Sequence, residues 1–288
     1  YREIVKALRD RGMEPFVTLW HWTIPIWLRD KGGINSRKFP EYFLRFSKVM
    51  AERLSEVRFW ITLNEPEIYT TNSYLRGIWP PQKRSLTASL SALTNLVSAH
   101  KKAYIAIKKI RPEAQIGVAK NNVFFEGWLA PAARWWWNRS FLDHIHRYQD
   151  FIGLNYYFHS RIKGFKFKRN ENKWTNDMGW EIYPEGIYHV LKELKKYRKP
   201  IYITENGVAD AKDVHREKFI KEHLEWVSKA IREGADVRGY FYWSLLDNFE
   251  WDKGFWPRFG LVEVDYKTMQ RKIRKSAWAL STMLSNQR

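Results

Sequence analysis

The sequence predicts an α/β fold of the (β/α)8 barrel type, and three observations support this prediction. Short apolar runs alternate with amphipathic helical patterns along the chain. The apolar runs are continuous, which is typical of parallel strands buried on both faces. Polar and aromatic residues gather where these runs end, and in a barrel of this type the active-site groups lie at the carboxyl ends of the strands.

Each strand is predicted from a run rich in β-branched and aromatic residues, and the helical stretches between the runs complete βα units with right-handed crossovers. The helix over 86–110 has a clear end, because Arg111 precedes Pro112 and a strand follows. The predicted strands are 15–22, 57–64, 115–120, 150–157, 200–205 and 238–245. The predicted helices are 1–11, 41–54, 86–110, 185–197, 214–233 and 270–284.

A glutamate lies at the end of each of two predicted strands. Glu65 directly follows the strand 57–64 in the run Thr-Leu-Asn-Glu-Pro, and Glu205 is the last residue of the strand 200–205 in the run Ile-Thr-Glu-Asn-Gly. Either glutamate alone is more often a surface or capping carboxylate. Two carboxylates held across a sugar pocket are the minimum equipment for breaking a glycosidic bond, so the pair favours that chemistry. Pro66 predicts an extended backbone at Glu65, which suits the end of a strand.

The other strand ends carry polar and aromatic residues as well. A flat doubly wound sheet is the structural alternative, but it is expected to carry a Gly-rich phosphate loop after an early strand, and the sequence has none. The barrel is therefore the preferred prediction. The residues at the strand ends are His21, Trp22, Asn64, Glu65, Asn121, Asn122, Asn155, Tyr157, Glu205, Asn206 and Trp243.

Composition predicts one domain over residues 1–288, since the 288 residues contain no low-complexity linker and no repeat. Aromatic residues make up 17% of the chain, with 16 Trp, which is mostly a core signal but also suits a sugar site. The chain has no Cys, which fits a cytoplasmic protein. No apolar stretch is long enough to span a bilayer, and we expect no membrane partner.

The formal net charge is +19, which raises the expectation of a polyanionic partner. Most of the Lys and Arg residues lie at helical spacing opposite apolar positions, so solvated helix faces explain them better. The densest basic run, 163–173, is predicted to be a surface loop or hairpin. No nucleic-acid-binding motif accompanies it, and we expect no nucleic-acid partner.

Five blocks of sequence, in order, resemble glycoside hydrolase family 1, the β-glucosidase and β-galactosidase family. The blocks are TLWHW with PIWL behind it (18–28), TLNEP (62–66), DFIGLNYY (150–157), ITENG (203–207) and WSLLDNFEW (243–251) with RFG (258–260) behind it. The resemblance spans nearly the whole chain. It implies a (β/α)8 barrel of which this chain supplies strands 3–8, with strands 1 and 2 missing or supplied elsewhere.

The resemblance also implies a mechanism with retention of anomeric configuration. Glu205 corresponds to the nucleophile and Tyr157 to its hydrogen-bond donor, while Glu65 corresponds to the general acid and base, which needs a raised pKa. No cofactor and no metal is needed. The family's glycone-binding Gln and Arg on strands 1 and 2 have no counterpart here, and the segment 125–138 is shorter than is usual in the family.

The substrate implied is a small β-glycoside or short oligosaccharide. A carboxylate at Glu250 can accept hydrogen bonds from the sugar 4-OH and 6-OH and would repel a 6-phosphate, so unphosphorylated β-D-glucosides or β-D-galactosides are expected. Asn64 is expected at the 2-OH and His21 at the 3-OH, although a His on an apolar strand is more often a core residue. The expected substrate-binding residues are His21, Trp22, Asn64, Asn155, Tyr157, Trp243, Glu250, Trp251 and Phe259.

Three alternatives remain open at this point. The first is that the chain is a sugar-binding pseudoenzyme. The second is that it is a fragment completed by a separate N-terminal piece or by a second copy, which would cover the exposed strand edges. The third, suggested only by the positive charge, is that it binds nucleic acid. Two further patterns have competing interpretations. His144 and His146 hint at a metal site but lie in a stretch that is predicted helical. Residues 135–137 are three consecutive Trp, which either pack against the barrel or form an exposed aromatic patch or ligand pocket.

Overall fold

The computed structural model describes residues 1–285, and the chain divides into two compact units. One unit contains Tyr1–Asn121 and Arg139–Gly153, and the other contains Asn122–Asn138 and the chain from Leu154 onward. Neither unit is a continuous stretch of sequence. A single catalytic domain over residues 1–288 stays a prediction.

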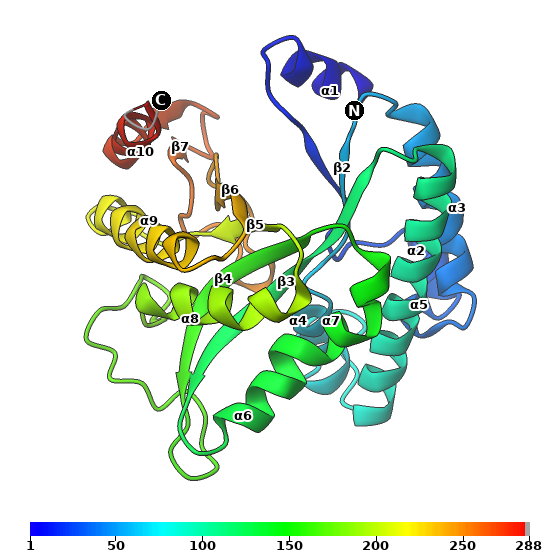
Figure 1. Cartoon of the computed structure of the whole chain (residues 1–288), viewed down its shortest axis with the longest axis horizontal. Helices are drawn as coiled ribbons and strands as arrows, with labels where there is room; N and C mark the ends of the chain where they lie inside the picture. Colours follow the sequence, from blue (N-terminus) through cyan, green and yellow to red (C-terminus); the bar gives the residue numbers. More distant parts are fainter. Residues whose placement is uncertain (286–288) are drawn as a thin grey trace. The chain divides into compact units, whose positions relative to one another are not determined.

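The first unit is built on parallel strands that alternate with helices (Figure 1). Strands β1, β2 and β3 lie side by side in that order, and both pairings are parallel. The main helices α3 and α5 pack against each other. The elements are α1 (Arg2–Arg9), β1 (Phe16–Trp20), α2 (Ile26–Asp30), η1 (Gly33–Asn35), α3 (Phe39–Arg53), β2 (Phe59–Asn64), α4 (Pro66–Thr70), η2 (Thr71–Leu75), α5 (Leu86–Ile110), the first part of β3 (Gln115–Glu126), α7 (Ser140–Ile145) and η4 (His146–Tyr148).

Helix α5 shows how the local sequence sets an element. It begins after Ser85, whose hydroxyl accepts a hydrogen bond from the Ala88 amide at 3.2 Å and so satisfies one of the unpaired amides at the helix start. Its buried positions include Ala92, Leu96 and Ala99, at the spacing of one helix face. The helix ends at Ile110, as predicted from Pro112.

The second unit repeats the alternation of strand and helix. Strands β4, β5 and β6 follow one another in the sheet, and β5 and β6 are parallel. Helices α8 and α9 pack together, and α10 packs on α9. The elements are the last part of β3, α6 (Ala130–Ala133), η3 (Arg134–Arg139, which ends at the boundary), β4 (Ile152–Arg161, which begins in the first unit), α8 (Glu185–Leu194), η5 (Lys195–Tyr197), β5 (Ile201–Asn206), α9 (Arg216–Arg232), β6 (Val237–Tyr242), η6 (Trp251–Lys253), β7 (Val262–Val264), β8 (Arg271–Ile273) and α10 (Lys275–Ser285).

All the predicted strands and helices have counterparts, but some boundaries and burial patterns were wrong. The predicted helix 270–284 begins as strand β8, which pairs with β7, and becomes helical only at Lys275. Strand β6 is not buried on both faces, because Arg238 and Phe241 are exposed where β6 ends the strand order. The predicted hairpin in the basic run is confirmed by an antiparallel bridge between Lys163 and Lys166.

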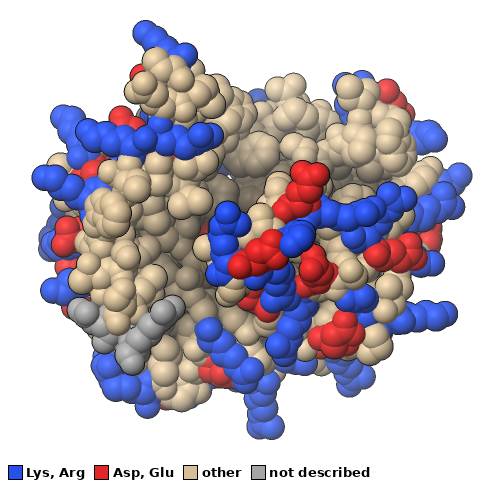
Figure 2. All heavy atoms as spheres, turned by 90° about the horizontal axis from the view of Figure 1, so that it is seen from above, with Lys and Arg blue, Asp and Glu red and all other residues tan. Residues whose placement is uncertain are grey.

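The positively charged side chains are widely distributed over the surface. On the face shown in Figure 2, Lys and Arg side chains are spread over the surface with Asp and Glu among them. This fits the interpretation of solvated helix faces better than one continuous basic patch. Within residues 1–285, the helices are too short or too polar to cross a bilayer.

A buried histidine joins three elements of the first unit. His100 on α5 is fully buried, with Nδ1 2.7 Å from the Thr62 hydroxyl and Nε2 2.7 Å from the Tyr148 carbonyl oxygen. The carbonyl can only accept, so Nε2 carries the proton and Thr62 donates to Nδ1. Burial lowers the pKa of His100 to about 4, although the bond to the Tyr148 carbonyl opposes that shift.

His100 therefore makes the stability of the protein sensitive to acid. The unfolded state binds a proton at this residue near pH 6.5, whereas the folded state does so only near pH 4. The contribution is fully present above pH 6.5 and is lost as the pH falls towards 4, by up to about 3 kcal/mol. Substituting His100→Gln should lower the pH slope of the unfolding free energy between pH 4 and 6.5 by up to about one proton. Denaturant titrations at several pH values measure this slope. The exposed His144→Gln is the control, and an unchanged slope in His100→Gln would contradict the assignment.

Candidate active site

The strand register brings three of the predicted residues together in the first unit. Trp20 of β1 lies opposite Leu63 of β2, so the residues that follow β1 reach the end of β2. His21 Nε2 lies 3.1 Å from the Asn64 side-chain nitrogen, and the Trp22 indole N–H donates to the Asn64 carbonyl at 2.9 Å. Burial lowers the pKa of His21 to about 4, so its imidazole is neutral at pH 7 and can accept as well as donate.

Glu65 follows β2 at a sharp change of direction. Its backbone is left-handed, with φ 41° and ψ 60°, so the extended conformation predicted from Pro66 was wrong. Pro66 is instead the first residue of α4, a position that its fixed φ favours, and Glu65 makes the turn from strand to helix. A side chain that is not glycine is strained at such a φ, and strain of this kind concentrates at functional sites.

The carboxyl group of Glu65 is held by a neighbouring strand. The residue is 5% exposed, its backbone N–H donates to the Ala119 carbonyl at 2.8 Å, and its Oε1 accepts from the Asn121 amide at 2.9 Å. Asn121 stood among the strand-end residues of the sequence but not among the predicted site residues. The parallel pairing of β2 with β3 is the signal that finds it, because Asn64 lies opposite Ala119.

A buried ion pair joins β3 to α4, the helix that begins directly after Glu65. Lys120 is fully buried, and its ammonium lies 3.1 Å from Glu67 Oε1 and donates to the Asn121 carbonyl at 2.8 Å. Burial raises the pKa of Glu67, and the charge of Lys120 opposes the shift. Glu67, Lys120 and Asn121 thus form a chain of contacts that leads to Glu65.

In the second unit, Glu205 near the end of β5 meets Tyr157 of β4. The Tyr157 hydroxyl donates to Glu205 Oε2 at 2.9 Å. The neighbouring Thr204 hydroxyl donates at 2.6 Å to Asn155 Oδ1, which fixes a second strand-end residue of β4 against β5. The hydroxyl donor stabilises the ionised form of the Glu205 carboxylate.

The end of β6 brings the last predicted residues to the end of β5. The Trp243 amide donates to the Asn206 carbonyl at 3.0 Å, and the Trp243 indole lies 3.3 Å from Glu250 Oε1. Gly207 allows this approach, because a Cβ there would lie 2.0 Å from the Trp243 carbonyl oxygen. Burial raises the pKa of Glu250, and the bond from Trp243 opposes the rise. Trp251 begins η6 with a φ of 48°.

An aromatic cluster surrounds Tyr157 in the same unit. Phe259 is buried and meets the Tyr157 ring edge-on, with 6.4 Å between ring centroids. Trp180 packs 6.3 Å from both Tyr157 and Phe259. Trp180 was missed by the sequence analysis, because it follows Gly179 in a turn far from any strand end.

The predicted residues thus form two groups. His21, Trp22, Asn64 and Glu65 lie in the first unit, and Asn155, Tyr157, Glu205, Trp243, Glu250, Trp251 and Phe259 lie in the second. The histidines that hinted at metal bond locally, His144 to the Ser140 carbonyl and His146 to the Asp143 carbonyl. Among residues 1–285, no group of three or more His, Cys, Asp or Glu is placed to hold a metal ion.

Comparison with known proteins decides the family. The model of glycosyl hydrolase family 1 matches residues 1–133 and 138–288. The chain belongs to glycosyl hydrolase family 1. Beta-glucosidase A of Thermotoga maritima is 34% identical over 342 residues, which cover 99% of this chain and 76% of that protein. A beta-galactosidase of Saccharolobus solfataricus is 33% identical, with 99% of this chain and 69% of that protein covered.

Solved structures agree with the family assignment. The β-glucosidase of Thermotoga maritima in complex with castanospermine has a TM-score of 0.92 at 33% identity, and the match covers 99% of this chain and 77% of that chain. The predicted (β/α)8 fold class and the predicted family are confirmed, and the chain is a glycoside hydrolase of the β-glycosidase type. It spans about three quarters of the length of these relatives.

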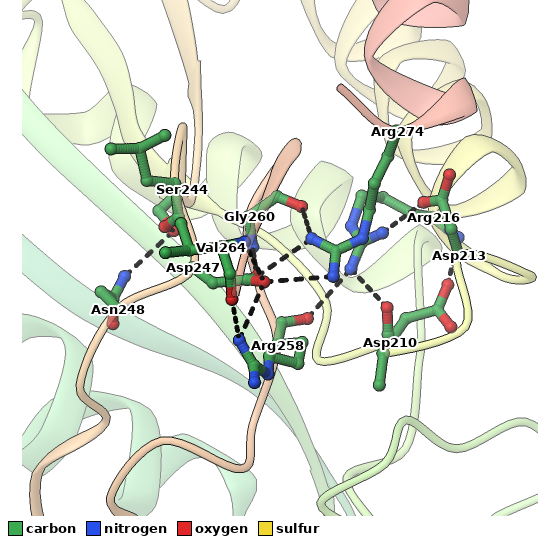
Figure 3. Close-up of polar contacts among 12 residues, drawn as sticks. Asp210, Asp213, Arg216, Ser244, Asp247, Asn248, Arg258, Gly260, Val264 and Arg274 are labelled. Atoms are coloured by element: carbon green, nitrogen blue, oxygen red, sulfur yellow. Dashed lines mark hydrogen bonds and ion pairs between the residues drawn. The ribbon is translucent and has the colours of Figure 1, made fainter. Parts of the chain in front are cut away.

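Within this family 1 chain, a buried aspartate anchors the loop that follows β6. Asp247 lies between Arg258 and Arg274, as Figure 3 shows. Arg274 reaches its two carboxylate oxygens at 3.0 and 3.1 Å, and the Gly260 amide donates to it at 2.9 Å. The loop of Glu250 and the segment of Phe259 are therefore tied to one carboxylate.

A second buried charge network fixes the segment that follows β5. Arg216 is fully buried at the start of α9, forms an ion pair with Asp213 and donates to the Asp210 carbonyl at 2.6 Å. It also reaches the Arg258 carbonyl at 2.9 Å, which joins this network to the one around Asp247 (Figure 3). Asp213 accepts from the Ser276 hydroxyl at 2.6 Å and so holds the start of α10.

The Asp247 network should have a large effect on stability. Substituting Asp247→Asn removes the charge that compensates the buried Arg274, and uncompensated buried charges cost about 3–5 kcal/mol. We expect the unfolding free energy to fall by about 3 kcal/mol in denaturant titrations. The exposed Glu263→Gln on β7 is the matched control and should change it by less than about 0.5 kcal/mol. A loss below about 1 kcal/mol in Asp247→Asn would contradict the anchoring role.

Proposed function

We propose that this chain is a retaining β-glycosidase that hydrolyses terminal, unphosphorylated β-D-glucosides and β-D-galactosides, with Glu205 as nucleophile and Glu65 as general acid and base. The observation that carries the proposal is the hydrogen bond of 2.9 Å from the Tyr157 hydroxyl to Glu205. A nucleophilic carboxylate must be ionised, and a hydroxyl donor at the end of a parallel strand favours that form.

The role of Glu65 is supported by how it is held. A general acid must keep a fixed direction toward the glycosidic oxygen, since proton transfer requires hydrogen-bond reach. The left-handed backbone of Glu65, its burial and the amide donor Asn121 restrict the carboxyl group to one orientation. Lys120, which pairs with Glu67, donates to the Asn121 carbonyl and so helps to hold Asn121 in position.

The reaction proceeds in two displacements. In the first, a Glu205 oxygen forms a bond to the anomeric carbon while the bond to the aglycone oxygen breaks and that oxygen takes a proton from Glu65. In the second, Glu65 takes a proton from water, whose oxygen bonds to the anomeric carbon and releases Glu205. Two inversions restore the β configuration. The proposal requires the two carboxyl groups to lie about 5–5.5 Å apart in the working enzyme.

The sugar specificity follows from the remaining groups. Relatives are named beta-glucosidase and beta-galactosidase, and the Thermotoga maritima enzyme has been solved with glucoimidazole and with galacto-hydroximolactam. We assign Glu250 to the 4-OH and 6-OH, because a carboxylate accepts from both hydroxyls and repels a 6-phosphate. Asn64 and His21 bind the 2-OH and 3-OH. Trp243 and Phe259 pack against the glycone, and Trp22, Asn155 and Trp251 complete the binding set.

Release of nitrophenol from aryl β-D-glucosides and β-D-galactosides tests the proposal. Glu205→Gln should abolish turnover, since an amide cannot replace the nucleophile. Glu65→Gln should slow turnover by about 10²–10⁴-fold, as expected for a lost general acid and base. The exposed Glu263→Gln is the control and should keep the wild-type rate. Proton NMR of the first sugar released should show the β anomer.

Inhibitor binding measured beside turnover separates the enzyme from a sugar-binding pseudoenzyme. Binding of glucose-like inhibitors by a folded wild-type protein that never turns over an aryl glycoside would support the pseudoenzyme. The α anomer as first product would overturn the double displacement but keep the hydrolase.

A further inference from the structure

A hairpin after β4 presents a phenylalanine at its tip. Lys163 and Lys166 form an antiparallel bridge, and each donates its N–H to the carbonyl of the other at 3.1 Å. The two residues between them, Gly164 and Phe165, make the turn, and Gly164 has a φ of 58°. Phe165 is 80% exposed. A single exposed apolar ring is common, but several that gather in one patch indicate an interaction surface.

A tryptophan from another segment lies against this tip. Trp128 follows β3, is 64% exposed, and donates its indole N–H to the Gly164 carbonyl at 3.2 Å. The rings of Trp128 and Phe165 meet edge to face, with centroids 5.5 Å apart. Strands β3 and β4 are neighbours in the sheet (Figure 1), and the segments that follow them together carry one aromatic tip, Trp128 with Phe165. Phe167, on the same hairpin, is 51% exposed.

The segments that carry the aromatic tip adjoin a buried apolar cluster. Val123, Phe125, Ala130 and Ile162 form this cluster. Ile162 directly precedes the hairpin, and Phe167 of the hairpin meets the ring of Phe125 edge-on at 6.4 Å.

Basic residues surround the aromatic tip. Lys163, Lys166, Lys168 and Arg169 are all exposed. The acidic Glu171 of the same segment pairs with Lys173 at 2.6 Å and with Arg161 at 2.8 Å, so its charge is compensated. The hairpin thus presents cations on both sides of an apolar ring, which is complementary to a negatively charged surface with an apolar interior.

We propose that this basic-aromatic hairpin, residues 163–169 with Trp128, binds the surface of an anionic lipid bilayer. Phe165 and Trp128 enter the boundary between headgroups and acyl chains, and Lys163 and Lys166 contact the phosphate groups. Aromatic rings that enter a bilayer need no common plane. This separates the tip from a platform for a glucan chain, because Trp128 and Phe165 stand at 78° to each other and offer no flat strip for stacked sugars.

This inference revises the expectation of no membrane partner. That expectation came from the missing bilayer-spanning stretch, but a protein that lies on a membrane needs no such stretch. The match to the family model is interrupted at 134–137, close to this region in the sequence. Within the interruption, Trp135 and Trp136 are about half exposed, at 53% and 49%, whereas Trp137 packs on the buried cluster beneath the hairpin. The Trp triplet thus divides between core and surface.

Sedimentation with lipid vesicles tests the proposal. The full chain should sediment with vesicles of phosphatidylcholine and phosphatidylglycerol and much less with phosphatidylcholine alone. Raising the salt from 0.1 to 0.5 M should weaken the binding, because screening shortens the reach of the charges. Phe165→Ala with Trp128→Ala, and separately Lys163→Glu with Lys166→Glu, should each lower the partition coefficient by at least about tenfold.

Matched controls decide whether the hairpin is the binding surface. Trp278→Ala removes a ring that is 61% exposed on α10, and Lys48→Glu with Lys221→Glu makes the same charge change on α3 and α9. Both controls should bind the mixed vesicles like the wild type. Equal losses in the controls, or no binding by the wild type, would overturn the proposal. So would binding to a β-glucan or to single-stranded RNA without binding to vesicles. The readout is independent of glycosidase activity.

Discussion

Parallel strand pairing is the constraint on which the arrangement of polar groups depends. When neighbouring strands run in the same direction, their carboxyl ends meet at one edge, and residues that follow one strand lie beside those that follow the next. In the first unit this register brings His21 to Asn64 and Asn121 to Glu65. In the second, Tyr157 of β4 meets Glu205 of the neighbouring β5, and the parallel pairing of β5 with β6 brings Trp243 to Asn206. These polar contacts at the strand ends follow from backbone pairing.

Ion pairs with buried members are the second organising feature of the structure. The pairs are Asp247 with Arg274, Lys120 with Glu67, and the buried Arg216 with the partly buried Asp213. Burying ions costs free energy, and well-packed apolar residues are often at least as stable. We interpret these pairs as devices that fix loop positions. The Asp247 pair holds the segments of Glu250 and Phe259, the Lys120 pair lies next to Glu65, and Arg216 reaches the Phe259 segment through the Arg258 carbonyl.

Much of the fold and of each half of the candidate site could be predicted from the sequence, because strand ends and short motifs are local signals. The turn at Glu65 could not, since the preference imposed by Pro66 was overridden by the need to begin α4 directly after β2. Trp180 was missed because only tertiary packing brings its turn to Tyr157. The exposed side of β6 and the strand at 271–273 depend on which neighbours each segment pairs with, and a single sequence does not encode that visibly.

The central claim is that Glu205 forms a covalent bond to the sugar, and labelling tests it most directly. A 2-deoxy-2-fluoro glucoside with a good leaving group slows both displacements by destabilising the positive charge at the anomeric carbon, and the second step then limits the reaction. Peptide mass spectrometry after incubation should find one fluoroglucosyl group on the peptide that contains Glu205, and none in Glu205→Gln. A label on a different carboxylate, or rapid hydrolysis of unmodified substrates without any label, would contradict the account.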